Sequence, residues 1–227
     1  MNGILLVDKP AGWTSHDVVA KVRSILKKET GQKVKVGHTG TLDPMATGLL
    51  ILVLGSYTKR VGEFSKLDKV YQAEINLGFN SSTGDAEGEL TKMSDKQPLK
   101  TSVEAVLSQF EGEILQRPHK YSAVKIDGQR AYKAARAGKT VEIEPRKVNI
   151  YEITDVKYDY PRLSFTCKVS SGTYIRSLAE DIGKALSTGA YLSALRRTQI
   201  GRFSITESIT APFSTNNLKT VAKSISS

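Results

Sequence analysis

Residues 36–50 read VGHTGTLDPMATGLL and combine three glycines, one proline, one histidine and a single carboxylate, Asp43. The stretch runs directly into residues 49–54, LLILVL, an apolar run whose length and composition predict a buried strand. A shorter strand is predicted before it, at residues 33–36. Glycine and proline at this density predict a stiff loop between the two strands. The loop carries one carboxylate, so the role of Asp43 decides how the stretch is interpreted.

Two interpretations of Asp43 remain open from the residues alone. In the structural one, Asp43-Pro44 begins a helical turn, because aspartate caps helices and proline suits their first position, and Gly48 ends that turn. This interpretation does not explain His38 or the glycines before Asp43. In the chemical one, a carboxylate on a stiff loop serves as a nucleophile or a base.

The rest of the chain alternates between strand and helix patterns. The predicted strands are residues 3–7, 33–36, 49–54, 69–77, 122–126, 140–143, 148–158 and 163–170, with a strand pair in 191–203 whose outgoing strand ends near 209. The predicted helices are residues 14–28, 101–110 and 173–186, with a weak helix at 217–225. The helix at 101–110 is predicted to begin with a capping box at Thr101 and Glu104. A basic helix is predicted to follow a turn at 127–128 and to end at residue 138. This mixture predicts an α+β fold with a mixed, largely antiparallel sheet flanked by helices.

The charge points to a polyanionic partner. The chain has 33 Lys and Arg against 23 Asp and Glu, a net charge of +10. Residues 117–147 hold nine of the basic residues and three acids, with Tyr121 and Tyr132 interleaved, and Arg196, Arg197 and Arg202 form a second basic group. Basic side chains bind phosphates and aromatic rings stack on unpaired bases, which favours nucleic acid over a merely solvated helix face.

Several other classes of protein are disfavoured. No segment reaches the roughly 20 apolar residues of a membrane span, and the N-terminus lacks a secretory pattern. The single cysteine, Cys167, excludes internal disulfides and predicts a reducing, cytoplasmic location. One cysteine and three histidines argue against zinc, and His16, Asp17, His38 and Asp43 have no metal-ligand spacing, so we predict no metal.

A second local pattern, SSGTYIR at residues 170–176, passes from a predicted strand into a predicted helix. Arg176 on that helix either pairs with Glu180 one turn later at the surface, or holds a carboxylate through a bidentate contact. The spacing alone favours the surface pair, but the sequence does not choose between the two.

Three blocks of sequence resemble one family in its own order: DKPAGWTS at residues 8–15, GHTGTLDPMATG at 37–48 and GTYIRSL at 172–178. Shorter matches lie at 68–71, 121–125 and 195–197. On these residues the chain resembles the bacterial tRNA pseudouridine-55 synthases of the TruB family, over roughly residues 1–210.

The resemblance implies the pseudouridine-synthase fold with a central RNA-binding cleft. It also implies an isomerase that flips uridine 55 out of the tRNA T-loop and converts it to pseudouridine without a cofactor. Residues 1–210 would form the catalytic domain, including a basic insertion at about 117–147 that clamps the T-arm. Many family members continue into a C-terminal RNA-binding domain of the PUA type; here the sequence departs from the family, and we expect residues 211–227 to form a short tail without a PUA domain. The expected partner is tRNA, and the expected state is a monomer. A non-catalytic tRNA chaperone, or a synthase for another RNA, is the alternative.

The resemblance also implies a role for each matching residue. Asp43 would be the catalytic carboxylate, attacking C1′ or C6 or assisting a glycal route. Arg176 would pair with Asp43, keep it ionised and orient it, and Tyr71 would stack on the uracil and assist proton movement at the sugar. The remaining implied residues are the uracil contacts His38, Tyr174 and Leu195, the bracing residues Lys9, Pro10 and Gly40, and the RNA-binding residues Lys120, Lys125, Arg130, Lys133 and Arg136. Without the resemblance, Tyr71 and Leu195 would be interpreted as core and His38 as a turn histidine.

Overall fold

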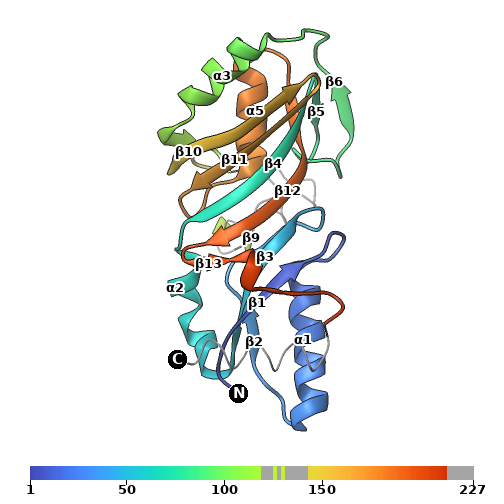
Figure 1. Ribbon diagram of the computed structural model, residues 1–227, viewed down its shortest axis with the longest axis vertical. Coiled ribbons are helices and arrows are strands. Elements are labelled where there is room, and N and C mark those ends of the chain that lie inside the picture. The colour runs from blue at the N-terminus through green and yellow to red at the C-terminus, as the bar shows by residue number, and fades with distance from the viewer. Residues whose placement is uncertain (119–124, 127–128, 131–142, 214–227) are drawn as a thin grey trace. The chain divides into compact units, whose positions relative to one another are not determined.

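The computed structural model describes residues 1–118, 125–126, 129–130 and 143–213 (Figure 1). The chain forms two compact units: unit 1 contains Met1–Tyr71 and the residues from Leu195 onward, and unit 2 contains Gln72–Ala194. The boundaries fall inside two strands, β4 (Lys69–Leu77) and β12 (Ala190–Ile200), so each of these strands supplies residues to both units.

Unit 1 is built on a sheet with the strand order β14-β1-β3-β12, in which β2 also pairs with β3 and β13 with β12. The pairs β1–β3 and β2–β3 are antiparallel, and β1–β14 and β3–β12 are parallel. Its elements are β1 (Gly3–Lys9), α1 (Ser15–Thr30), β2 (Val36–His38), β3 (Thr47–Leu54), the 3-10 helix η1 (Gly55–Arg60), α2 (Val61–Ser65), β13 (Phe203–Ser204), the 3-10 helix η2 (Ile205–Glu207) and β14 (Ile209–Thr210).

Strand β3 is buried on both of its faces. Leu50, Leu52 and Leu54 pack with α1 on one face. Leu49 and Ile51 pack on the other face, with Phe203 and with partly buried side chains of η1 and α2. A strand covered on both faces has an unbroken apolar sequence, which is why LLILVL shows no alternation.

Helix α1 confirms the predicted helix at residues 14–28 and identifies its cap. The side chain of Thr14 accepts from the backbone of Asp17, and the Asp17 carboxylate accepts from the backbone of Thr14, which completes a capping box. The helix ends at Gly31, whose φ of 68° lies in the left-handed region that glycine adopts without strain.

Unit 2 contains a sheet with the strand order β12-β4-β11-β10-β7, in which β10 pairs antiparallel with both β11 and β7. The helices α3 and α5 pack against each other, and α3 also contacts β10 (Figure 1). Its elements are β5 (Phe79–Ser81), β6 (Leu90–Lys92), α3 (Lys100–Gln109), β7 (Gly112–Gln116), β8 (Lys125–Ile126), β9 (Gln129–Arg130), β10 (Arg146–Asp159), β11 (Arg162–Val169) and α5 (Ile175–Ala185).

The α+β class and the largely antiparallel pairing are confirmed, and several local predictions are wrong. Helix α3 begins one residue early, with Leu99 as its N-cap and no side-chain bond, so the capping box at Thr101 does not form. Gln129–Arg130 is a strand where a helix was predicted. The short elements between 55 and 65, and the strands β5, β6 and β7, were not predicted. The predicted turn at 127–128, most of the basic helix and the helix at 217–225 lie outside the described residues.

In the part of the chain that the structure describes, the helices are too short or too polar to cross a membrane.

Candidate active site

Asp43 lies in unit 1, in a loop of residues 39–46 that joins β2 to β3; we call it the Asp43 loop. Ser15 Oγ accepts from the backbone nitrogen of Leu42 at 2.9 Å and donates to the Leu42 carbonyl oxygen at 3.3 Å. The side chains of Leu42 and Ala46 are buried, at 4% and 0% exposure, while Asp43 between them is half-buried. No helix forms at residues 43–48, so the helical interpretation of Asp43-Pro44 is wrong. The loop is fastened instead by its backbone and apolar side chains.

Lys9 holds the residue after Asp43. Its ammonium is fully buried and donates to the carbonyl oxygens of Pro10 at 3.0 Å, Trp13 at 2.6 Å and Pro44 at 3.2 Å. The Pro44 carbonyl also accepts from the backbone nitrogen of Gly12 at 2.9 Å. A buried ammonium is costly unless its hydrogen bonds are made, and these carbonyls supply them. The first block of the sequence, DKPAGWTS, is thereby bonded to the second.

His38, Tyr71 and Leu195 belong to the same unit as Asp43. His38 is the last residue of β2, is paired with Leu52 of β3 and is half-buried. Tyr71 and Leu195 are each 8% exposed, on β4 and β12. Such burial suits core side chains and also side chains that line a base pocket, so their predicted roles toward uracil remain predictions.

Lys69, two residues before Tyr71, is a second buried cation in unit 1, and it lies on the same alternating face of β4 as Tyr71, Ala73 and Ile75. Its Nζ donates to the carbonyl oxygen of Ser65 at 2.6 Å and also to that of Leu67. Burial lowers the pKa of Lys69 to about 8, and the positive charge of Arg197 adds to this effect.

The lowered pKa of Lys69 predicts a pH dependence of stability. The folded protein releases this proton near pH 8, whereas the unfolded chain keeps it up to the ordinary value of 10.5. Between these values the unfolded state holds more protons, so the free energy of unfolding rises with pH, by up to about 3 kcal/mol from this group. Urea unfolding from pH 7.5 to 10.5 should show this rise in the wild type and not in Lys69→Met. The exposed Lys66, changed to Met, is the matched control. An equal slope in Lys69→Met and in the wild type would refute the assignment.

Arg176 lies in the first turn of α5, in unit 2, and its side chain is 8% exposed. Its Nη1 lies 3.3 Å from Asp85 Oδ2 and donates to the Thr83 carbonyl oxygen at 3.1 Å. The other oxygen, Asp85 Oδ1, accepts from Thr83 Oγ1 at 2.6 Å and from the backbone nitrogen of Glu87 at 3.1 Å. Arg176 is therefore a buried residue with a buried carboxylate partner, and the interpretation of a solvent-exposed surface pair is wrong.

Asp85 was not predicted as a site residue from the sequence. It lies in the segment 80–88, NSSTGDAEG, which has the composition of an ordinary polar loop. The sequence feature that marks this position is Gly84-Asp85 after a cluster of Ser and Thr. That combination is common in turns and does not by itself indicate a buried carboxylate. The fold shows that this carboxylate is 2% exposed and faces an arginine.

Tyr174 is the N-cap residue of α5 and is half-buried. The amide of Gln116 holds its backbone on both sides: Oε1 accepts from the Tyr174 nitrogen at 2.8 Å, and Nε2 donates to the Tyr174 carbonyl oxygen at 3.0 Å. Gln116 is 1% exposed, so this clamp fixes the start of the helix that carries Arg176.

The predicted RNA-binding residues lie largely beyond the described part of the chain. Lys120, Lys133 and Arg136 are outside it. For Lys125 and Arg130 only the backbone is described, and the two residues are paired directly between the antiparallel strands β8 and β9. Their contribution to RNA binding remains a prediction.

Within the described ranges, no group of three or more His, Cys, Asp or Glu side chains is arranged to hold a metal ion.

Solved structures resemble the chain over most of its length. A chain in the crystal structure of a Cbf5-Nop10-Gar1 complex matches it with a TM-score of 0.71 and 33% identity, over 92% of this chain and 52% of that one. A chain in the structure of an H/ACA RNP bound to a substrate RNA containing 2′-deoxyuridine matches with a TM-score of 0.67 and 31% identity, over 92% and 50%. The chain thus spans about half the length of these solved relatives.

Curated relatives and family models match the chain by sequence. The tRNA pseudouridine synthase B of Thermobifida fusca (strain YX) is 46% identical over 220 residues, covering 92% of this chain and 73% of the relative. The protein of the same name from Stutzerimonas stutzeri (strain A1501) is 46% identical over 212 residues, covering 92% and 67%. The model of the TruB family pseudouridylate synthase N-terminal domain matches residues 23–175, and that of the tRNA pseudouridylate synthase B C-terminal domain matches 176–216. The chain belongs to the TruB family of pseudouridylate synthases.

Proposed function

We propose that this protein is a tRNA pseudouridine synthase that converts uridine 55 of the T-loop to pseudouridine, with Asp43 as its catalytic carboxylate. The observation that carries the proposal is the Asp43 loop, in which one half-buried carboxylate is held between anchored neighbours, in a chain 46% identical to curated tRNA pseudouridine synthases. A fixed geometry is what a reaction at a single sugar carbon requires, since small displacements of a reacting group cost rate steeply.

The reaction is an isomerisation. The bond from C1′ to N1 breaks, the uracil turns, and C5 bonds to C1′. C5 then loses its hydrogen as a proton, and N1 gains one, so substrate and product have the same composition. Because no net oxidation occurs, the isomerisation needs a catalytic carboxylate and a site that holds the uracil while it turns, rather than an electron carrier. Asp43 acts by attack at C1′, by attack at C6, or by assisting a glycal route.

The other site residues hold the reactants. Arg176 orients the catalytic carboxylate, and Asp85 fixes Arg176. Tyr71 stacks on the flipped uracil, while Tyr174 and Leu195 line its pocket. When uridine 55 flips out, it leaves a gap between the stacked bases of the T-loop. His38 fills this gap, so that the remaining bases stay stacked.

The RNA partner is bound through its phosphates. The net charge of +10, more than half of it in residues 117–147, supports tRNA as the partner. The protein acts as a monomer, because an RNA-binding groove on one chain needs no partner chain. The single cysteine supports a cytoplasmic location.

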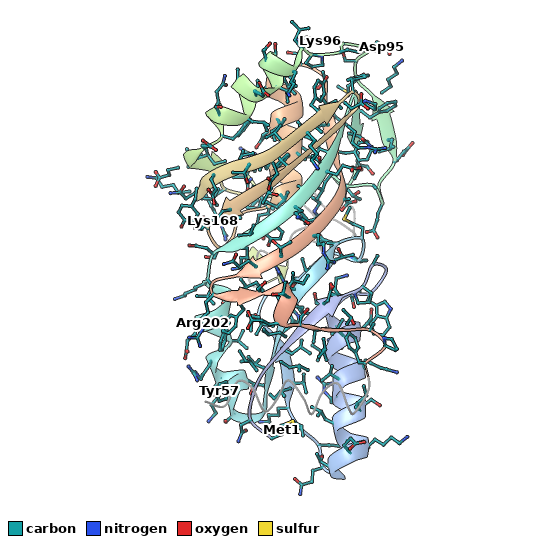
Figure 2. The ribbon with its side chains drawn as sticks, in the orientation of Figure 1. Met1, Tyr57, Asp95, Lys96, Lys168 and Arg202 are labelled. Carbon is teal, nitrogen blue, oxygen red and sulfur yellow. The ribbon has the colours of Figure 1, made fainter. Side chains whose placement is uncertain are left out.

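Neutralising the basic segment should weaken tRNA binding. In the triple variant Arg130→Gln, Lys133→Gln and Arg136→Gln, we expect the slope of log K against log salt to flatten by about one unit for each phosphate that is no longer neutralised. Filter binding across a salt series measures this slope. The control removes three exposed cations of β10 and β11, Lys157, Arg162 and Lys168 (Lys168 is labelled in Figure 2), and should leave the slope unchanged. Identical slopes in the triple variant and the wild type would rule out this segment as the phosphate-binding surface.

The function itself is tested by tritium release from unmodified tRNA labelled at uridine C5, because C5 loses its hydrogen when it bonds to C1′. Release mapped to uridine 55 supports the proposal. Folded protein that binds tRNA without release would identify a non-catalytic RNA chaperone. Release from other RNAs alone would change the substrate and keep the chemistry.

A further inference from the structure

Arg197 connects the Asp43 loop to the strand that follows it. It lies on β12 in unit 1, in parallel register with Gly48 at the start of β3, and is 1% exposed. Its Nε donates to the Leu49 carbonyl oxygen at 2.7 Å, and its Nη2 donates to the Gly40 carbonyl oxygen at 3.2 Å. One buried guanidinium thus binds β3 with one nitrogen and the Asp43 loop with another.

Gly40 of the Asp43 loop and Gly48 of β3 both lie close to this arginine. Gly48 has a φ of 108°, and a Cβ added there would lie 2.6 Å from the backbone nitrogen of Arg197 and closer still to its carbonyl oxygen. That close approach sets β12 directly beside β3. A Cβ added at Gly40 would lie 3.6 Å from Arg197 Nη1, in ordinary contact. The guanidinium therefore lies directly against the backbone of the Asp43 loop at Gly40.

A buried charge at this place needs a reason. An apolar side chain would fill the same volume without the cost of desolvating a guanidinium. Binding of RNA phosphate does not supply the reason, because a side chain with 1% exposure is not presented to solvent. The neighbouring Arg196 differs from Arg197 in its exposure and in its partner. Its side chain is 39% exposed, and it pairs with the carboxylate of Asp8 at 2.7 Å. Arg197 instead holds the loop carbonyl three residues before Asp43.

We propose that Arg197 is a positioning residue for the reaction: its forked contact with Leu49 and Gly40 fixes the N-terminal side of the Asp43 loop, as Lys9 fixes the C-terminal side through Pro44. The inference rests on the proposed function, because it assumes that Asp43 performs the chemistry. Asp43 is then held from both directions along the chain by buried cations that act through the backbone.

Two variants test the proposal. Arg197→Met removes the charge and both hydrogen bonds, while Arg197→Lys keeps the charge but replaces the planar fork by a single ammonium. In a single-turnover tritium assay at saturating tRNA, we expect the rate constant to fall about a hundredfold in Arg197→Met. We expect a fall of at least about tenfold in Arg197→Lys, since one ammonium does not reproduce the spacing of the fork. The affinity for tRNA should stay within about twofold of the wild type, because the phosphate-binding side chains are unchanged.

The matched control is Arg60→Met, which removes an exposed arginine of unit 1 that pairs with Glu63 at 2.8 Å and stacks over Tyr57 at 4.8 Å (Tyr57 is labelled in Figure 2). It should keep the wild-type rate. All rates are measured below the thermal transition of each variant, so that only folded protein is compared. If Arg197→Met does not fold, Arg197→Lys decides.

The outcomes separate the two proposals. A folded Arg197→Lys with lowered stability and a wild-type rate would show that Arg197 is only structural and would overturn this inference, leaving the proposed function intact. A wild type that releases no tritium would overturn the proposed function, and the inference with it. A lowered rate with unchanged tRNA affinity in Arg197→Lys supports both.

Discussion

Changing Asp43 to asparagine should lower the single-turnover rate of pseudouridine formation by at least about a thousandfold. Asparagine has the size of aspartate but lacks the anionic oxygen that attacks the nucleotide or takes a proton. The hydrogen bonds that anchor the loop are made by the backbone of Leu42 and Pro44. The variant should therefore fold and bind tRNA like the wild type, so that the effect falls on the chemical step.

Tritium release from C5-labelled tRNA measures that step, with tRNA affinity and thermal unfolding measured in parallel. The control is Asp95→Asn, at an exposed carboxylate of unit 2 that pairs with Lys92 at 2.6 Å and should keep the wild-type rate. Release by Asp43→Asn at the wild-type rate would show that another group performs the chemistry. Failure of the same variant to bind tRNA would give Asp43 a role in recognition instead.

Breaking the Arg176–Asp85 pair should have the second largest effect, because both side chains are buried, at 8% and 3% exposure. Removing one partner of a buried ion pair leaves an uncompensated charge and typically costs about 3–5 kcal/mol. Arg176→Met should lower the free energy of unfolding by roughly 3 kcal/mol. If Arg176 orients the catalytic carboxylate as proposed, the same variant should lower the reaction rate about a hundredfold.

The double variant Arg176→Met with Asp85→Leu separates stability from chemistry. Replacing both charges by apolar side chains is often neutral for stability, so the double variant should regain most of the free energy of unfolding that the single variant loses. Its reaction rate should stay low, because position 176 no longer carries an arginine. As a control, Arg162→Met breaks the partly exposed pair with Glu74, at 3.6 Å, and should cost less than about 1 kcal/mol. A double variant with the wild-type rate would show that the pair serves only the fold.

The sequence determined the features that depend on near neighbours in the chain. The alternation of β4 put Tyr71, Ala73 and Ile75 on its buried face, as predicted. The helix predicted at residues 14–28 forms as α1, and its capping box is local, because Thr14 and Asp17 satisfy each other within one turn. The family blocks also predict site roles for Asp43 and Arg176, since each block is a continuous stretch whose residue types can be matched directly.

Local patterns failed where packing overrode them. Asp43-Pro44 is a good helix start by composition, yet Ser15 and Lys9 hold Leu42 and Pro44 in a loop. The capping box at Thr101 was plausible by spacing, but α3 begins at Lys100 with no side-chain cap.

Only the tertiary structure decided which charges are buried and what they bind. Arg176 meets Asp85 across 91 residues of sequence, and Arg197 meets Gly40 across 157. No periodicity links such partners, because their meeting depends on how strands and helices pack rather than on spacing along the chain. From the sequence, the resemblance implied a bracing role for Lys9, whereas Arg197 was grouped with the basic residues that favour nucleic acid. Both side chains are buried on backbone carbonyls. The sequence predicts Asp43 as the carboxylate of the site, and the fold shows which loop carbonyls the buried cations Lys9 and Arg197 bind.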